Sequence, residues 1–530
     1  MRRLVAAMAV LLLALGAGPV ARAEASAAAT PARAGAAASS TTGFRWNDIT
    51  ATDGVILKSN VIAPTAPGRH PGVIFVASWG LNDFQYLAQA KKLAENGYVV
   101  LSYTARGFWF SGGKIEVAGP PDIADASTAV DWLIAHTAVD PERIGIAGLS
   151  YGGGISLLAA AHDKRLRAVA AMSGWADMAE SMSGEETRRP QAAFFLEAVA
   201  RLVGQPSDEM NRILADYWAG RNDDYREEWA RGRSVRYSVG ELNANHPAVL
   251  IAHAYGDSIF PVNQMVDLFD HLTTPRRLEL APGDHATVEV SGLLGLPNHV
   301  WTSLQRWLDH YLKGVDNGID REPPVVLRPH GSGPAESYAG TGIGTVKRET
   351  LGRPGGWDKT GTLGRASDQA WSYQLTSGVG TTANGGIALV SNGLEQLTGV
   401  PPTVWLPSVN RRHAGVWVSD RQATAASIRG EVRVHLGIDP HRPDGTVVAY
   451  LYDLDAWGIG RLITHAPTSW HGAAGPFPVE LSLPMTAYDV PAGHQLALVV
   501  DTKDPLYFDS NTRGAPLTFT GPSWMELPLR

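Results

Sequence analysis

The pentapeptide Gly148-Leu149-Ser150-Tyr151-Gly152 constrains this chain more than any other feature. It stands between an apolar run, 144–147, and a run of small residues, 153–161, which predicts a strand, a sharp turn and a helix. Glycines flank Ser150 because so tight a turn leaves no room for a Cβ. The serine would lie beside the free N–H groups of the next helix. The motif therefore favours a nucleophilic serine, and the alternative is a turn kept only for packing.

Two further polar residues follow buried, strand-like runs. Asp257 comes after the run 247–255, and His285 comes after the run 278–281. The order serine, acid, histidine is that of an α/β-hydrolase, and the three residues would lie at the carboxyl ends of neighbouring parallel strands. His285 would take the proton of Ser150, and Asp257 would hold the tautomer of His285. We therefore expect Ser150, Asp257 and His285 to be catalytic.

Each partner of the serine has an alternative interpretation. Asp257 could cap the helix that begins near Pro261, and His285 could be a surface-loop histidine. Asp284 is a rival acid, but adjacent residues on a turn rarely face each other. His253 lies inside a predicted strand, so we expect it to be a core histidine.

Two groups are expected to form the oxyanion hole. The first is the backbone N–H of Tyr151, directly after the nucleophile, and the second is a donor of Trp79 in the loop after the apolar run 73–77.

Three aromatic residues are predicted to line the substrate pocket. Phe108 and Trp109 lie in the loop after the strand-like run 98–103, and Trp175 follows the predicted strand after the elbow. Packing beneath a cap is the alternative role for all three. Glu185 and Glu186 would either recognise a substrate amine or form a solvated helix end.

The periodicity of the chain divides it into parts. Strand-like and helix-like segments alternate through 44–320, which predicts an α/β sheet covered on both faces. Helical spacing within about 175–245 interrupts this rhythm and predicts an inserted helical cap. From residue 321 Pro and Gly increase and period-two runs follow, so we expect a linker at 321–363 and an all-β jelly-roll sandwich at 364–530.

The N-terminus has the features of a secretory signal peptide. Arg2 and Arg3 precede an apolar run, 4–15, and Ala21-Arg22-Ala23 offers a cleavage site. The run is too short to cross a bilayer, although a membrane anchor is the alternative. We expect a signal peptide at 1–23, a disordered segment at 24–43, and a secreted protein without a membrane span after cleavage.

Composition narrows the chemistry. The 530 residues include no cysteine, which excludes a thiol nucleophile and a Cys-ligated metal. No paired-histidine helix motif is present, so no metal and no cofactor are expected. The net charge of −7 gives no reason to expect nucleic acid as a partner. A small molecule or a short peptide is the expected substrate, and the sequence makes no prediction of oligomeric state.

Several motifs together carry a family resemblance. The segments G-L-S-Y-G-G, Y-T-A-R-G-F-W-F-S-G-G, Y-G-D and G-D-H, with the cap and the trailing β domain, resemble the X-prolyl dipeptidyl aminopeptidase and cocaine-esterase family of serine hydrolases. The resemblance covers nearly all of the mature chain. It implies an acyl-enzyme mechanism with Ser150, Asp257 and His285 as the triad. The family commonly uses a tyrosine hydroxyl as an oxyanion donor, where this chain has Trp79.

The resemblance implies hydrolysis of esters or of amides that follow an Xaa-Pro dipeptide. Two alternatives stay open. The first is a general carboxylesterase of the same fold, and the second is a non-catalytic secreted protein that binds a glycan or a wall polymer.

Overall fold

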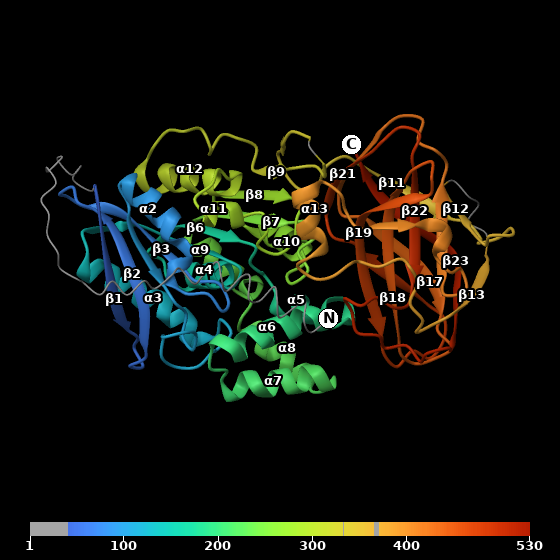
Figure 1. Cartoon of the computed structure of the whole chain (residues 1–530), viewed down its shortest axis with the longest axis horizontal. Helices are drawn as coiled ribbons and strands as arrows, with labels where there is room; N and C mark the ends of the chain where they lie inside the picture. Colours follow the sequence, from blue (N-terminus) through green and yellow to red (C-terminus); the bar gives the residue numbers. More distant parts are fainter. Residues whose placement is uncertain (1–40, 332, 365–369) are drawn as a thin grey trace, which may run out of the picture.

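The computed structural model describes residues 41–331, 333–364 and 370–530, which form two units side by side along the long axis of the molecule (Figure 1). The expected signal peptide, 1–23, lies outside the described residues, as do residues 24–40 of the segment expected to be disordered. The first strand begins at Thr42, two residues before the boundary predicted at residue 44.

A ten-stranded sheet of described residues forms the centre of the first unit. Its order is β1-β2-β4-β3-β5-β6-β7-β8-β9-β10. Strands β3 to β9 run parallel, and antiparallel pairs close both edges. The strands are β1 Thr42–Thr50, β2 Ile56–Pro64, β3 His70–Val76, β4 Val99–Tyr103, β5 Val139–Leu149, β6 Leu166–Met172, β7 Ala248–Ala254, β8 Arg276–Ala281, β9 Val325–Leu327 and β10 Glu336–Tyr338.

Helices cover both faces of this sheet, because alternate residues of its central strands point to opposite sides. Ile74 and Val76 pack in one hydrophobic core, with side chains of α3, α4 and α10. Val73 and Phe75 pack in the other, with side chains of α2 and α12. The helices are α2 Leu87–Glu95, α3 Pro120–His136, α4 Tyr151–His162, α10 Asn263–His271, α11 Val290–Leu293 and α12 His299–Lys313, with the short 3₁₀ helix η1 Asp83–Tyr86. This is the covered α/β sheet that the strand–helix alternation predicts.

A run of helices is inserted between β6 and β7, where the sequence predicts a cap. Most of them gather along one edge of the first unit, shown in green in Figure 1, whereas the last helix lies beside α4. The elements are α5 Met178–Ser183, η2 Gly184–Glu186, α6 Pro190–Val203, α7 Asp208–Ala219, α8 Asp223–Arg231, η3 Val235–Ser238 and α9 Val239–Asn245. Asp177 caps α5, since its side chain accepts hydrogen bonds from the N–H groups of Ala179 and Glu180.

The second unit is a mostly antiparallel β domain with two hydrophobic cores. The predicted period-two run is strand β17, in which Val434, Leu436 and Ile438 are buried and alternate with more exposed residues. One helix, α13 Ser391–Thr398, and the 3₁₀ helix η4 Leu406–Ser408 interrupt the described strands. These strands are β11 Thr345–Leu351, β12 Gly361–Gly364, β13 Ser372–Thr376, β14 Thr403–Trp405, β15 Ala414–Ser419, β16 Ala426–Gly430, β17 Arg433–Asp439, β18 Gly445–Leu454, β19 Ile459–Trp470, β20 Phe477–Ser482, β21 Thr486–Val490, β22 Gln495–Asp501 and β23 Pro516–Leu529.

The segment predicted as a linker, 321–363, contains four strands instead. Strands β9 and β10 extend the sheet of the first unit, whereas β11 and β12 belong to the β domain. The chain therefore passes from one unit to the other between Tyr338 and Thr345. These strands are short or strongly exposed and are separated by Pro and Gly, so hydrophobic periodicity does not mark them.

Among the helices of the described ranges, none has both the length and the apolar character that a membrane crossing requires.

Candidate active site

The predicted elbow forms between β5 and α4. Ser150 has φ 58° and ψ −118°, a strained backbone conformation that non-glycine residues rarely adopt. A Cβ on Gly148 would lie 2.3 Å from the backbone of Gly152, and a Cβ on Gly152 would lie 2.1 Å from the carbonyl oxygen of Val76. Only glycine fits at these two positions, so the local sequence forces Ser150 into the turn.

The structure brings Ser150, His285 and Asp257 into one hydrogen-bonded row. The Ser150 hydroxyl donates to Nε2 of His285 across 2.7 Å, and Nδ1 of His285 donates to Oδ2 of Asp257 across 2.9 Å. Asp257 follows β7 and His285 follows β8, so neighbouring parallel strands deliver both side chains to the same sheet edge. In this arrangement Nε2 can accept the serine proton.

Burial and pairing set the charges of this row. Burial opposes ionisation of Asp257, but His285 and the N–H groups of Ile259 and Phe260 hold the pKa of its carboxyl below the usual value. Burial also disfavours the imidazolium of His285, yet the Asp257 carboxylate raises the pKa of His285 above its usual value. The pair is therefore arranged to stabilise the imidazolium that forms when Ser150 loses its proton.

The rival acid, Asp284, has a different role. Its Oδ1 accepts the backbone N–H groups of His285 at 2.7 Å and of Ser258 at 2.8 Å, and no hydrogen bond joins it to the His285 ring. Burial and the nearby charge of Asp257 raise the pKa of Asp284 to about 6. His253 is buried in β7, as expected for a core histidine, and its Nε2 contacts the carbonyl oxygen of Phe260 at 2.8 Å. Asp257 is thus the carboxylate that contacts the imidazole.

The two expected oxyanion positions differ in what they offer. The indole N–H of Trp79 donates to the carbonyl of Leu196 in cap helix α6 at 2.9 Å, so this group is already engaged. The backbone N–H groups of Trp79 and Tyr151 donate to no other group within the described residues. These two N–H groups, rather than the indole, are therefore free to bind an oxyanion.

A cavity of 670 Å³ lies between Ser150 and the cap. Trp175 lines it, as predicted, and so do Trp79, Tyr151 and Phe260. A Cβ on Gly154 would lie 2.3 Å from the indole of Trp175, so the glycine-rich start of α4 makes room for this ring. The pocket is thus built from the elbow helix, the strand ends and the cap, and Thr468 and His471 of the β domain complete its wall.

Phe108 and Trp109 do not line this cavity, contrary to the prediction. Phe108 is buried behind it, with its ring centroid 4.9 Å from Trp79. The indole N–H of Trp109 donates to the carbonyl of Gly80 at 2.9 Å, and its backbone N–H donates to Val203 of α6. The end of α6 covers this loop, so the two rings support the base of the cap.

Acidic side chains outnumber basic ones on the cap side of the cavity. Its wall includes Asp177, Glu180, Glu185 and Glu186, and the basic residues in the same wall are Arg188, Arg226 and Arg231. Glu180 is half-buried, and within the described residues it forms no ion pair; burial and the nearby charge of Asp177 raise its pKa. Sequence reasoning singled out Glu185 and Glu186 but missed Glu180. The spacing of Asp177 and Glu180, an N-cap acid followed three residues later by Glu, marks a helix start here and was the available signal.

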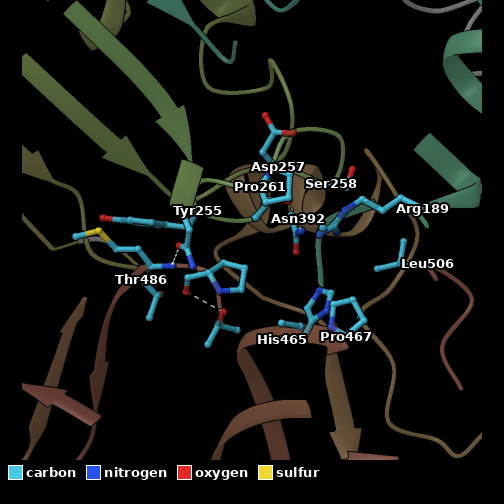
Figure 2. A pocket seen from close by; sticks show the side chains of 18 of the residues that line it. Arg189, Tyr255, Asp257, Ser258, Pro261, Asn392, His465, Pro467, Thr486 and Leu506 are labelled. Atoms are coloured by element: carbon cyan, nitrogen blue, oxygen red, sulfur yellow. Dashed lines mark hydrogen bonds between the residues drawn. The ribbon is translucent and has the colours of Figure 1, made fainter. Parts of the chain in front are cut away.

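A second cavity, of 320 Å³, separates the two units (Figure 2). Residues of the loop after β7, including Tyr255, Asp257 and Ser258, line one side, and β-domain residues such as His465 and Thr486 line the other. Its wall shares Glu180, Gly184 and Glu185 with the larger cavity. The loop that carries the triad acid therefore lies between the active-site cavity and the β domain.

Within the described ranges, no group of three or more His, Asp or Glu side chains is placed to hold a metal ion.

Two family models match the chain. Residues 53–287 match the X-Pro dipeptidyl-peptidase (S15 family) model, and residues 317–525 match the X-Pro dipeptidyl-peptidase C-terminal non-catalytic domain. The first match lies within the first unit, and the second covers the β domain together with β9 and β10 of the first sheet.

Curated relatives are distant. A 31.7 kDa protein of Escherichia coli without an assigned role is 27% identical over 31% of this chain and 60% of its own length. A protein of Streptomyces avermitilis, provisionally named a Xaa-Pro dipeptidyl-peptidase, is 23% identical over 80% of this chain and 69% of its own length. The chain covers no more than 60% of the first few curated relatives that it matches.

Solved structures share the complete architecture. An α-amino acid ester hydrolase has a TM-score of 0.74 at 16% identity, over 97% of this chain and 100% of that one. A CocE/NonD family hydrolase of Staphylococcus aureus has a TM-score of 0.71 at 14% identity, over 92% and 94%. At these identities the likeness establishes the fold, an α/β-hydrolase domain followed by a β domain.

Proposed function

Since this chain belongs to the X-prolyl dipeptidyl-peptidase and cocaine-esterase family of α/β-hydrolases, we propose that it is a serine hydrolase that works through an acyl-enzyme. The observation that carries this proposal is the hydrogen-bonded row of Ser150, His285 and Asp257, with 2.7 and 2.9 Å between successive partners. The same row disfavours the alternative of a non-catalytic glycan- or wall-binding protein. The signal peptide expected at 1–23 would deliver the enzyme outside the cell.

The chemistry follows from the positions of these groups. Ser150 Oγ attacks the acyl carbon as its proton passes to Nε2 of His285, and the backbone N–H groups of Tyr151 and Trp79 stabilise the oxyanion. Collapse of the tetrahedral intermediate breaks the bond to the leaving group, which takes the proton from His285. A water molecule, activated by the same imidazole, then attacks the acyl carbon, releases the carboxylic acid and restores the Ser150 hydroxyl.

The proposed substrate carries a protonated amine near the scissile bond. The acidic wall of the 670 Å³ cavity supports this, because Glu180 and Glu185 face it without an ion-pair partner in the described parts of the chain. A charge-assisted hydrogen bond to an ammonium group would favour the ionised form of these carboxylates. Amides that follow an Xaa-Pro dipeptide and esters of α-amino acids both present such an amine.

A simple carboxylic ester is the second candidate. The apolar part of the same cavity, formed by Trp79, Trp175 and Phe260, supports it, since an uncharged acyl group would bind there without reaching the carboxylates.

Two measurements test the proposal. A fluorophosphonate probe should label the protein, and Ser150→Ala should abolish the label; a wild-type protein that stays unlabelled would contradict the serine-hydrolase proposal. Ala-Pro-p-nitroanilide, an α-amino acid p-nitrophenyl ester and p-nitrophenyl acetate then separate the substrates. A clear preference in kcat/KM for the first two supports recognition of the amine, whereas equal rates with acetate support the simple esterase.

A further inference from the structure

Helix α13 belongs to the β domain in sequence but lies against the first unit. It stands beside β7 and α10, the elements that flank the loop of Asp257 (Figure 1). Leu389, just before α13, packs on the hydrophobic core of the first unit. The family model that covers this helix describes a non-catalytic domain, so its contacts with the catalytic loops call for a physical explanation.

The first set of contacts holds the loop of the triad acid. The side-chain amide of Asn392 donates to the carbonyl of Gly256 at 2.7 Å, one residue before Asp257. The backbone N–H of Leu389 donates to Oγ of Ser258 at 3.0 Å, one residue after Asp257. Figure 2 shows Asn392 beneath this loop, with Asp257 and Ser258 above it. The β domain is thus hydrogen-bonded to the residues on both sides of the triad acid.

The fit around Asn392 is close. A Cβ on Gly256 would lie 2.5 Å from Nδ2 of Asn392, so glycine is required for the amide to reach the carbonyl. Leu389 has φ 67°, a left-handed conformation that costs free energy in a residue with a Cβ. Backbone strain of this kind persists only where the surroundings fix it, and here the fixed contact is the one to Ser258.

Helix α13 also reaches the neighbouring loops. The side-chain oxygen of Gln396 lies 3.3 Å from the place that a Cβ on Gly283 would occupy, two residues before His285. Glu395 pairs with Nδ1 of His330 at 2.5 Å, and the His330 ring stacks on Tyr255 with 5.4 Å between ring centroids. Helix α13 therefore contacts both the loop of Asp257 and the loop of His285, and these two side chains must meet in the triad.

The acid loop has little to hold it from within its own backbone. The N–H of Asp257 donates to the carbonyl of Ala254 at 3.4 Å, which is long for such a bond. The strong bonds of the carboxylate, to Ile259 and Phe260, fix its orientation relative to the following residues but not the position of the loop. Bonds within the first unit reach the residues on either side, from the N–H of Tyr255 to the carbonyl of Ala281 at 2.9 Å and from the N–H of Ser258 to Asp284 at 2.8 Å. Among the described residues, the carbonyl of Gly256 accepts a hydrogen bond from Asn392 alone, so Asn392 fixes the one peptide that these bonds leave unheld.

We infer that Asn392 of the β domain is a positioning residue for the triad, holding Gly256 so that the Asp257 carboxylate meets His285. This inference rests on the proposed serine-hydrolase function. Asn392 touches no reacting atom, and it acts through the backbone of the acid loop. The β domain then takes part in catalysis without contributing a group to the chemistry.

The test uses the full chain with Asn392→Leu, which keeps a similar volume but removes the donor. Leu397→Ala is the matched control, because Leu397 lies on the same helix and the residue is 82% exposed. The rate constant for fluorophosphonate labelling of Ser150 and the kcat and KM for the best ester are measured on each protein. Asn392→Leu should lower the labelling rate and kcat by about 10- to 100-fold with KM within threefold of wild type. The control should match wild type.

A second variant keeps the inference testable if Asn392→Leu does not fold. Ser258→Ala removes the acceptor of the Leu389 N–H and leaves Asn392 in place, and it should reduce kcat by about three- to tenfold. Labelling and kcat within twofold of wild type in folded forms of both variants would overturn the inference. A change in KM alone, with kcat equal to that of wild type, would also contradict the inference. An unlabelled wild-type protein would instead remove the serine-hydrolase proposal itself, so the two failures are distinguishable.

Discussion

The indole N–H of Trp79 donates to the carbonyl of Leu196 at 2.9 Å, so the loop after β3 is tied directly to cap helix α6. The same residue lies where the oxyanion hole is expected, and its ring packs edge-on against Tyr151 with 5.1 Å between centroids. The side chain of Trp79 therefore joins the cap to the elbow, whereas its backbone N–H is the expected oxyanion donor.

Replacing Trp79 with Phe separates the role of the indole from that of the backbone N–H. The variant keeps the backbone N–H and an aromatic ring but loses the bond to Leu196. If the backbone N–H is the oxyanion donor, kcat for an ester should fall by less than about tenfold, because loss of a true oxyanion donor costs about 100- to 1000-fold. A fall of about 100-fold or more at unchanged protein stability would assign the indole as the donor. Steady-state kinetics and a thermal melt decide between the two.

Asp257 and Asp284 offer a paired comparison of two buried carboxylates. Asp257→Asn should reduce kcat by about 10⁴-fold, because the imidazole loses the partner that fixes its tautomer. Asp284→Asn keeps an acceptor oxygen for the N–H groups of His285 and Ser258, so kcat should stay within about tenfold. Single-turnover labelling of each variant measures this difference. Equal losses would mean that the two carboxylates share the role of triad acid.

Glu180→Gln tests the acidic wall of the cavity. The neutral side chain keeps its size but cannot pair with an ammonium group, so kcat/KM for an α-amino ester should fall about 10- to 100-fold. The rate with p-nitrophenyl acetate should not change, because that substrate has no amine. Glu241→Gln, at an exposed position on α9, is the control. Parallel losses with both substrates would point to a structural defect instead of amine recognition.

The acid side of the pH profile should reflect His285. Only the neutral imidazole accepts the serine proton, so kcat/KM falls as pH drops through the pKa of His285. Asp257 raises the pKa of His285 above the usual 6.5, and Asp284 and Glu289 act in the same direction. The midpoint of this loss of activity should therefore lie at a pH above 6.5. In Asp257→Asn the midpoint should move to lower pH, as measured by the pH dependence of fluorophosphonate labelling. A midpoint that does not move would mean that another group governs this limb.

The sequence predicted the triad and the main layers because local signals carry them. Ser150, Asp257 and His285 each follow a short buried run, and parallel strands deliver the residues after them to one edge without any knowledge of the packing. The cap and the β domain can be predicted from the sequence for a similar reason, because the period of the hydrophobic pattern changes over tens of residues in each.

The errors arise where position depends on contacts between distant segments. Phe108 and Trp109 occupy the predicted loop, but α6 of the cap folds over it and takes them out of the cavity. The bonds of Trp79 to Leu196 and of Asn392 to Gly256 span 117 and 136 residues, and no local pattern marks them. Strands β9 and β10 have three residues each, too few for an alternation to be recognised.

The backbone of Ser150 has a consequence for how this enzyme can change over evolutionary time. Glycine would adopt φ 58° and ψ −118° freely, whereas serine adopts them at a cost in folding free energy. The proposed nucleophile is thus a residue that makes the fold less stable than it could be. Selection for greater heat resistance alone would favour the loss of this hydroxyl, and only continued demand for turnover keeps it in place.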